Sequence, residues 1–283
     1  MSDSAVLDTY RYLRGGMVVM IVLLGAAVLI ERWHASCWQT TISAYYFTSA
    51  HAVFIAALCV IGALLIVYEG NSDTEDALLN FAGILAFVVA MVPTSRPVLL
   101  CGSAALDVDG RSAIVNTWAV VVALAVSRAA SWWLHHRNAT TPTRSTLGTA
   151  AAWVQRLALA AGVVVLALTP DWFRVNAHGV AAVAMFGAII LTVAIAAFTA
   201  GNTRYRRTYQ VIAASMAVTL LGAVVLHYLL DGFNHAIIVV EAALIGEFAI
   251  YWMVQTVELW GTVTRLGLLA PDALSNSRIL RAL

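Results

Sequence analysis

Eight long apolar stretches run through the sequence and constrain its fold more than any other feature. A helix needs about 20 mostly apolar residues to cross the roughly 30 Å hydrocarbon core of a bilayer. In that core only helices and closed barrels satisfy their own backbone hydrogen bonds, and stretches of this length are typical of helices. The sequence therefore predicts an all-α, polytopic transmembrane helical bundle. Its spans are approximately residues 15–31, 51–68, 77–93, 113–134, 150–170, 178–200, 209–230 and 236–257.

The composition agrees with a membrane protein. Hydrophobic residues make up 61% of the chain and charged residues only 11%, whereas an ordinary soluble domain has about a quarter charged residues. Such a small number of charged residues cannot form a polar surface around an apolar core. Many of the apolar side chains must therefore face lipid. Residues 1–283 are predicted to form a single integral membrane domain, with 258–283 as a short cytoplasmic tail.

The distribution of basic residues predicts the orientation. All 16 basic side chains are arginine, and basic residues accumulate on the cytoplasmic side of membrane proteins. With the N-terminus inside, ten arginines fall in cytoplasmic segments and four in external loops. Arg128 and Arg156 lie within the fourth and fifth spans, near cytoplasmic ends where long side chains reach the headgroups. Both termini are therefore predicted to be cytoplasmic, in a bacterial cytoplasmic (inner) membrane.

Five of the seven histidines fall at the predicted outer boundary, where His51 opens the second span and His178 the sixth. Imidazole and carboxylate groups at one depth suit zinc or another divalent metal. They also suit a sensor of external pH, and histidine is an ordinary resident of the wet headgroup zone. All three interpretations stay open. The candidate metal ligands are His51, His178, His227, Asp231 and His235.

Four polar side chains lie inside predicted spans: Asn80, Asn116, Glu241 and Glu247. An ionised side chain inside a span costs about 2.5 to 3.5 kcal/mol on insertion scales, so the two glutamates should face protein. Six residues apart, they point about 120° from each other and need separate partners, such as Asn116, Tyr228 or a histidine. They predict either a proton or cation path or a polar clamp between helices, and the two asparagines are expected to bond between helices.

Two of the three cysteines predict a disulfide. Cys37 and Cys101 fall in the first and third external loops, where disulfides persist, whereas Cys59 lies inside the second span.

A motif before the second span carries a family resemblance. Residues 42–48 read I-S-A-Y-Y-F-T, and an E-D-x-x-x-N connection follows at 75–80. This resembles uncharacterised bacterial multi-pass membrane proteins with an I-S-x-Y-Y-x-T loop motif. More distantly, Ile42-Ser43 and His178-Gly179 resemble the Frag1/DRAM/Sfk1 family, whose members have about six spans. That resemblance implies a role in membrane-lipid organisation without a known catalytic site.

The aromatic residues of this motif also have a physical interpretation. Ser43, Tyr45, Tyr46 and Phe47 precede the second span, and tyrosines in such positions favour an interfacial aromatic anchor. Substrate binding is the alternative.

Three functions are consistent with these patterns. The first is a non-enzymatic protein that organises membrane lipids or accompanies another membrane protein or a second copy of itself. The second is a proton- or cation-coupled small-molecule transporter. The third is a metal-dependent intramembrane hydrolase similar to the alkaline ceramidases. No basic stripe indicates a nucleic-acid partner, and no nucleotide-binding or hydrolase motif was found in the sequence.

Overall fold

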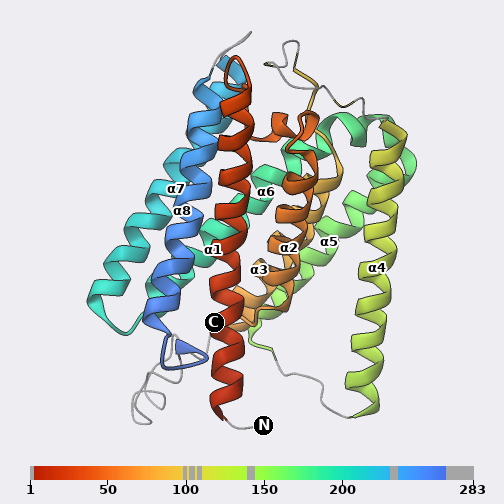
Figure 1. Ribbon diagram of the computed structural model, residues 1–283. Helices are drawn as coiled ribbons and strands as arrows, with labels where there is room; N and C mark the ends of the chain where they lie inside the picture. Colours follow the sequence, from red (N-terminus) through yellow and green to blue (C-terminus); the bar gives the residue numbers. More distant parts are fainter. Residues whose placement is uncertain are drawn as a thin grey trace.

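The computed structural model describes residues 3–97, 101, 106, 110–138, 144–229 and 235–265, and among these residues its regular secondary structure is all helical (Figure 1). Seven of its helices are long and apolar enough to cross a membrane, and the eighth, of 17 residues, is about 25 Å long. The predicted all-helical transmembrane bundle is confirmed. The helices are α1 (Asp3–His34), η1 (Ser43–Phe47, a 3-10 helix), α2 (His51–Val67), α3 (Asp73–Met91), α4 (Gly110–Arg137), α5 (Thr146–Leu168), α6 (Pro170–Thr199), α7 (Thr203–Leu229) and α8 (Ala236–Glu258).

The helix that contains the predicted sixth span begins eight residues before it. Helix α6 begins at Pro170, with Thr169 alone between it and the end of α5. Proline is favoured at the first position of a helix because it needs no backbone donor there. As a result His178 lies two turns inside α6 and does not open it.

Six helices form a closed ring in the order α1, α2, α3, α6, α7, α8, with α8 packed back against α1. Helices α4 and α5 lie outside it, packed against α3 and α6, and Figure 1 shows α4 at the right edge of the bundle. Only 11% of the residues in the apolar window of α4 are buried, against 44% in α6. Most of the buried core therefore lies within the ring, and the exposed Arg128 and Arg156 belong to the two outer helices.

The tightest packing in the ring joins α2 to α3. A Cβ atom added to Gly83 would lie 2.5 Å from the carbonyl oxygen of Gly62, and one added to Gly62 would lie 2.7 Å from that of Gly83. Side chains do not approach a backbone oxygen that closely. These two positions therefore require glycine so that the backbones can touch.

A buried ionic cluster lies at the end of the ring where α8 ends. The Arg265 guanidinium is 3.2 Å from the Glu75 carboxylate and 3.1 Å from that of Glu258, and Tyr209 donates a 2.6 Å hydrogen bond to Glu258. Burial acts to lower the pKa of Arg265, but Glu75, Tyr209 and Glu258 outweigh burial and raise it, so this arginine stays charged. We call these four residues the Arg265 cluster.

Two arginines of α1 bind the backbone of the segment 259–263, which links the end of α8 to Arg265. Arg14 is fully buried and donates to the carbonyl oxygens of Leu259 and Val263, and Arg11 donates to that of Trp260. The start of α1 and the end of α8 therefore lie at one end of the bundle, as an even number of crossings requires. That this end faces the cytoplasm stays a prediction from the arginine distribution.

At the opposite end of the bundle, a disulfide joins Cys37 to Cys101, and Cys59 is a free thiol. The bridge closes a loop of 64 residues, so the Cys37→Ser/Cys101→Ser variant should lose about 2–4 kcal/mol of stability. Thermal unfolding in detergent measures this loss, and Cys59→Ser is the control that should unfold like the parent protein. A non-reducing peptide map in which Cys37 and Cys101 are both free would contradict the assignment.

Candidate functional site

The candidate site is built around η1, the short helix between α1 and α2, which folds inward at one end of the ring. Its aromatic side chains are buried: Tyr45, Tyr46 and Phe47 are 1%, 3% and 4% exposed. Consecutive side chains of a 3-10 helix point about 120° apart, so three buried in a row mean that protein surrounds η1 on all sides. Burial raises the pKa of the Tyr45 and Tyr46 hydroxyls. The predicted interfacial aromatic anchor is therefore wrong, because these rings face the protein core.

Ser43 begins η1 and is hydrogen-bonded to His178 of α6. The Ser43 Oγ lies 2.9 Å from His178 Nε2, and His178 Nδ1 lies 2.6 Å from the carbonyl oxygen of Val92. A carbonyl only accepts, so Nδ1 carries the ring hydrogen, and in the neutral imidazole Nε2 is the acceptor. The Ser43 hydroxyl therefore donates to His178. The histidine is 5% exposed, so neighbouring protein fixes this orientation.

Glu241 of α8 contacts the backbone at the start of η1. Its carboxylate accepts a 2.6 Å hydrogen bond from the backbone N–H of Ile42, and the backbone of Ser43 is a further donor. Within the part of the chain that the structure describes, no basic side chain contacts this carboxylate. Among the described residues, the donors to Glu241 are thus the backbone N–H groups of Ile42 and Ser43.

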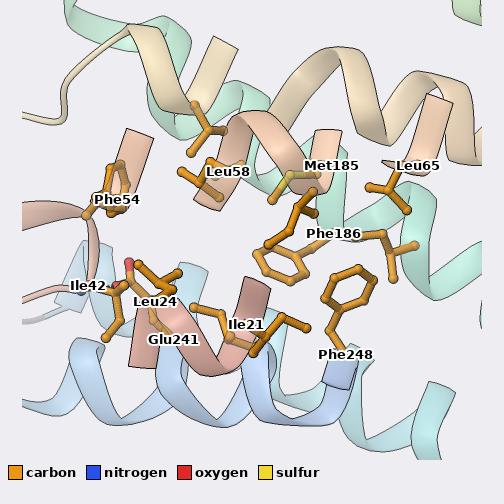
Figure 2. A pocket seen from close by; sticks show the side chains of 16 residues that line it. Ile21, Leu24, Ile42, Phe54, Leu58, Leu65, Met185, Phe186, Glu241 and Phe248 are labelled. Carbon is orange, nitrogen blue, oxygen red and sulfur yellow. Dashed lines mark hydrogen bonds between the residues drawn. The ribbon is translucent and has the colours of Figure 1, made fainter. Parts of the chain in front are cut away.

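An apolar pocket of about 90 Å³ runs from these groups into the ring. Of its 16 lining residues, only Ser43 and Glu241 are polar. Figure 2 shows Glu241 beside Ile42 at one end of the pocket and Phe248 and Leu65 toward the other. The pocket is a narrow apolar space with polar groups at one end. Its remaining walls come from α1, α2, α3, α6 and α8: Ile21, Leu24, Phe54, Leu58, Ile61, Val89, Ala182, Met185, Phe186, Ile189 and Ile245.

Among the residues that the structure describes, no three of the predicted metal ligands come together. His51 binds the carbonyl oxygen of Tyr46 through Nδ1 at 2.5 Å, whereas His227 and His235 are exposed near the ends of α7 and α8. Asp231 lies outside the described residues. Among the described residues, no group of three His, Cys, Asp or Glu side chains could hold a metal ion.

The predicted partners of the other intramembrane polar residues are wrong, although Glu241 and Glu247 do have separate partners. Glu247 accepts hydrogen bonds from the hydroxyls of Ser215 and Thr219 on α7, so it clamps α8 to α7. Asn80 donates to the carbonyl oxygen of Asp76 on its own helix, and Asn116 is exposed on α4.

The contact that sequence reasoning missed is the one between Ser43 and His178, which are 135 residues apart. Helical periodicity predicts which face of a helix is buried, but it does not predict which other helix packs against that face. The signal that could have paired them is the family resemblance, because both residues belong to the stretches that carry it.

Comparison with known protein families, curated proteins and solved structures gives no match for this chain.

Proposed function

We propose that this multi-pass membrane protein binds an acyl chain of a membrane lipid inside its helical ring and so organises lipid in a bacterial inner membrane. One observation carries the proposal: the pocket is apolar along its length and polar at one end. A membrane lipid is divided in the same way, into an apolar acyl chain and a polar headgroup. The more distant resemblance to the Frag1/DRAM/Sfk1 family, whose members are linked with lipid organisation, points the same way.

The polar groups of the ring favour a lipid over an ion. A transported proton or cation needs a polar path to mid-membrane between helices, whereas the space beside Glu241 is walled by hydrocarbon. Glu247 is already bonded to Ser215 and Thr219. Neither glutamate supports a continuous polar route.

The size of the pocket limits how the chain would bind. At about 90 Å³ it is smaller than the 150 Å³ apolar cavity that admits benzene. With the wall side chains in their present rotamers, the pocket has room for a few methylene groups of an acyl chain. A longer chain requires new rotamers of wall residues such as Met185, whose unbranched side chain adapts readily.

Filling the pocket should abolish this binding. Ala182→Phe places a ring in the space that the chain would occupy, and we expect at least tenfold less cross-linking of a photoactivatable fatty acid to detergent-purified protein. Ala242→Phe is the matched control, because Ala242 is exposed on α8, and it should cross-link as the parent protein does.

Overpacking can itself cost about 1–3 kcal/mol, so both variants are first compared by thermal unfolding. Undiminished cross-linking in a folded Ala182→Phe protein would overturn the proposal.

A further inference from the structure

Ser43, His178 and Val92 form a directed chain of hydrogen bonds at the polar end of the pocket. The Val92 carbonyl fixes Nδ1 as the protonated nitrogen, which leaves Nε2 free to accept the Ser43 hydroxyl proton. A serine bonded to an imidazole that a third group orients is the arrangement of an activated nucleophile.

Ser43 also lines the pocket. A chain bound along the hydrocarbon walls would bring its polar end to the Ser43 hydroxyl. If the bond between Ser43 and His178 only held η1 against α6, it would not require Ser43 to line a cavity.

We propose that Ser43 is a nucleophile and His178 its general base, and that together they cleave the ester bond of a lipid whose acyl chain occupies the pocket. The proposal rests on the lipid binding proposed above. It adds an activity, acyl-ester hydrolysis.

The chemical steps balance with the lipid ester and water as the only reactants. Ser43 Oγ bonds to the acyl carbon while its proton passes to His178 Nε2. The ester C–O bond then breaks, and the alcohol leaves with that proton. Water attacks the acyl-serine with His178 again accepting a proton, which releases a fatty acid and restores the serine hydroxyl.

The carboxylate of Glu241 marks the place of the developing negative charge. One of its oxygens lies 2.6 Å from the backbone nitrogen of Ile42, slightly closer than the roughly 2.7–3.1 Å at which a donor stabilises an oxyanion. In the proposed reaction, the Glu241 carboxylate therefore occupies the position that the carbonyl oxygen of the ester would take. Its side chain must change conformation before the ester can bind there. In this scheme Glu241 is a positioning residue that keeps the resting site closed.

A long-chain alkyl fluorophosphonate, which phosphonylates activated serines, tests the proposal on the full-length protein in detergent. Peptide mapping should find the label on Ser43, and Ser43→Ala should remove it. His178→Asn, which can still donate to Val92, should slow labelling at least 100-fold. Glu241→Ala should speed labelling by about tenfold, because it frees the backbone donors. Ser49→Ala is the control, since Ser49 is exposed and bonded to Glu31.

Fatty-acid cross-linking is measured on the same variants and separates the two proposals. Cross-linking retained in Ser43→Ala shows a folded protein with its binding pocket intact. If the parent protein and Glu241→Ala both cross-link the fatty acid but neither is labelled at Ser43, hydrolysis is overturned and lipid binding survives. Labelling that is unchanged in a His178→Asn protein that still cross-links would also overturn the assigned pair.

Discussion

Replacing Arg265 with alanine should lower the free energy of unfolding by about 3–5 kcal/mol, the range measured when one partner of a buried ion pair is removed. The guanidinium is the cationic partner of both Glu75 and Glu258, and the three side chains are 4%, 0% and 3% exposed. Without it, two carboxylates stay buried and uncompensated. Denaturant or thermal unfolding in detergent measures the loss.

Arg174→Ala is the matched control for that change. Arg174 faces Asp171 at 3.7 Å, and the two side chains are 48% and 96% exposed. Exposed pairs of this kind contribute about 0–1 kcal/mol, so this variant should unfold nearly as the parent protein does. Equal losses in the two variants would mean that the Arg265 cluster does not hold the end of α8 in the ring.

Gly83→Ala should also have a large effect, a loss of about 3 kcal/mol at the upper end of the overpacking range. The added methyl group would meet the carbonyl oxygen of Gly62 at 2.5 Å. A backbone atom cannot move aside as a side chain does, so α2 and α3 must separate along their contact. The midpoint of thermal unfolding reports the change.

Gly162→Ala separates this packing effect from helix propensity. A methyl group on Gly162 of α5 would meet no atom within 4 Å, and alanine is the better helix former by about 1 kcal/mol. This variant should be as stable as the parent or slightly more so. A Gly83→Ala protein that behaves like Gly162→Ala would contradict the close contact of α2 with α3.

The helices could be predicted from the sequence, but their order around the ring could not. Hydropathy locates apolar stretches and gives no neighbour for any of them. The apolar stretches of α4 and α5 predict spans as clearly as those of the ring helices, yet these two pack outside it. The extra turns at the start of α6 were missed because Asp171 and Arg174 lower the hydropathy there.

The candidate site was predicted one residue at a time and assembled wrongly. His51, His178, His227 and His235 were grouped because they share a depth in the membrane, but depth does not fix the position around the ring. Ser43 and Glu241 were each singled out, and neither was paired with its partner. Glu75 stood in an acidic connection without a base because its cation, Arg265, comes from the far end of the chain.

The acyl chain inside the ring is the central claim, and mapping the cross-links of a fatty acid with a diazirine at its terminal carbon tests it most directly. With the carboxyl end near Ser43, the account predicts cross-links on Leu65 and Phe248, at the far end of the pocket, and their loss in Ala182→Phe. Cross-links found only on exposed side chains, such as Val122 or Val126 of α4, would contradict it.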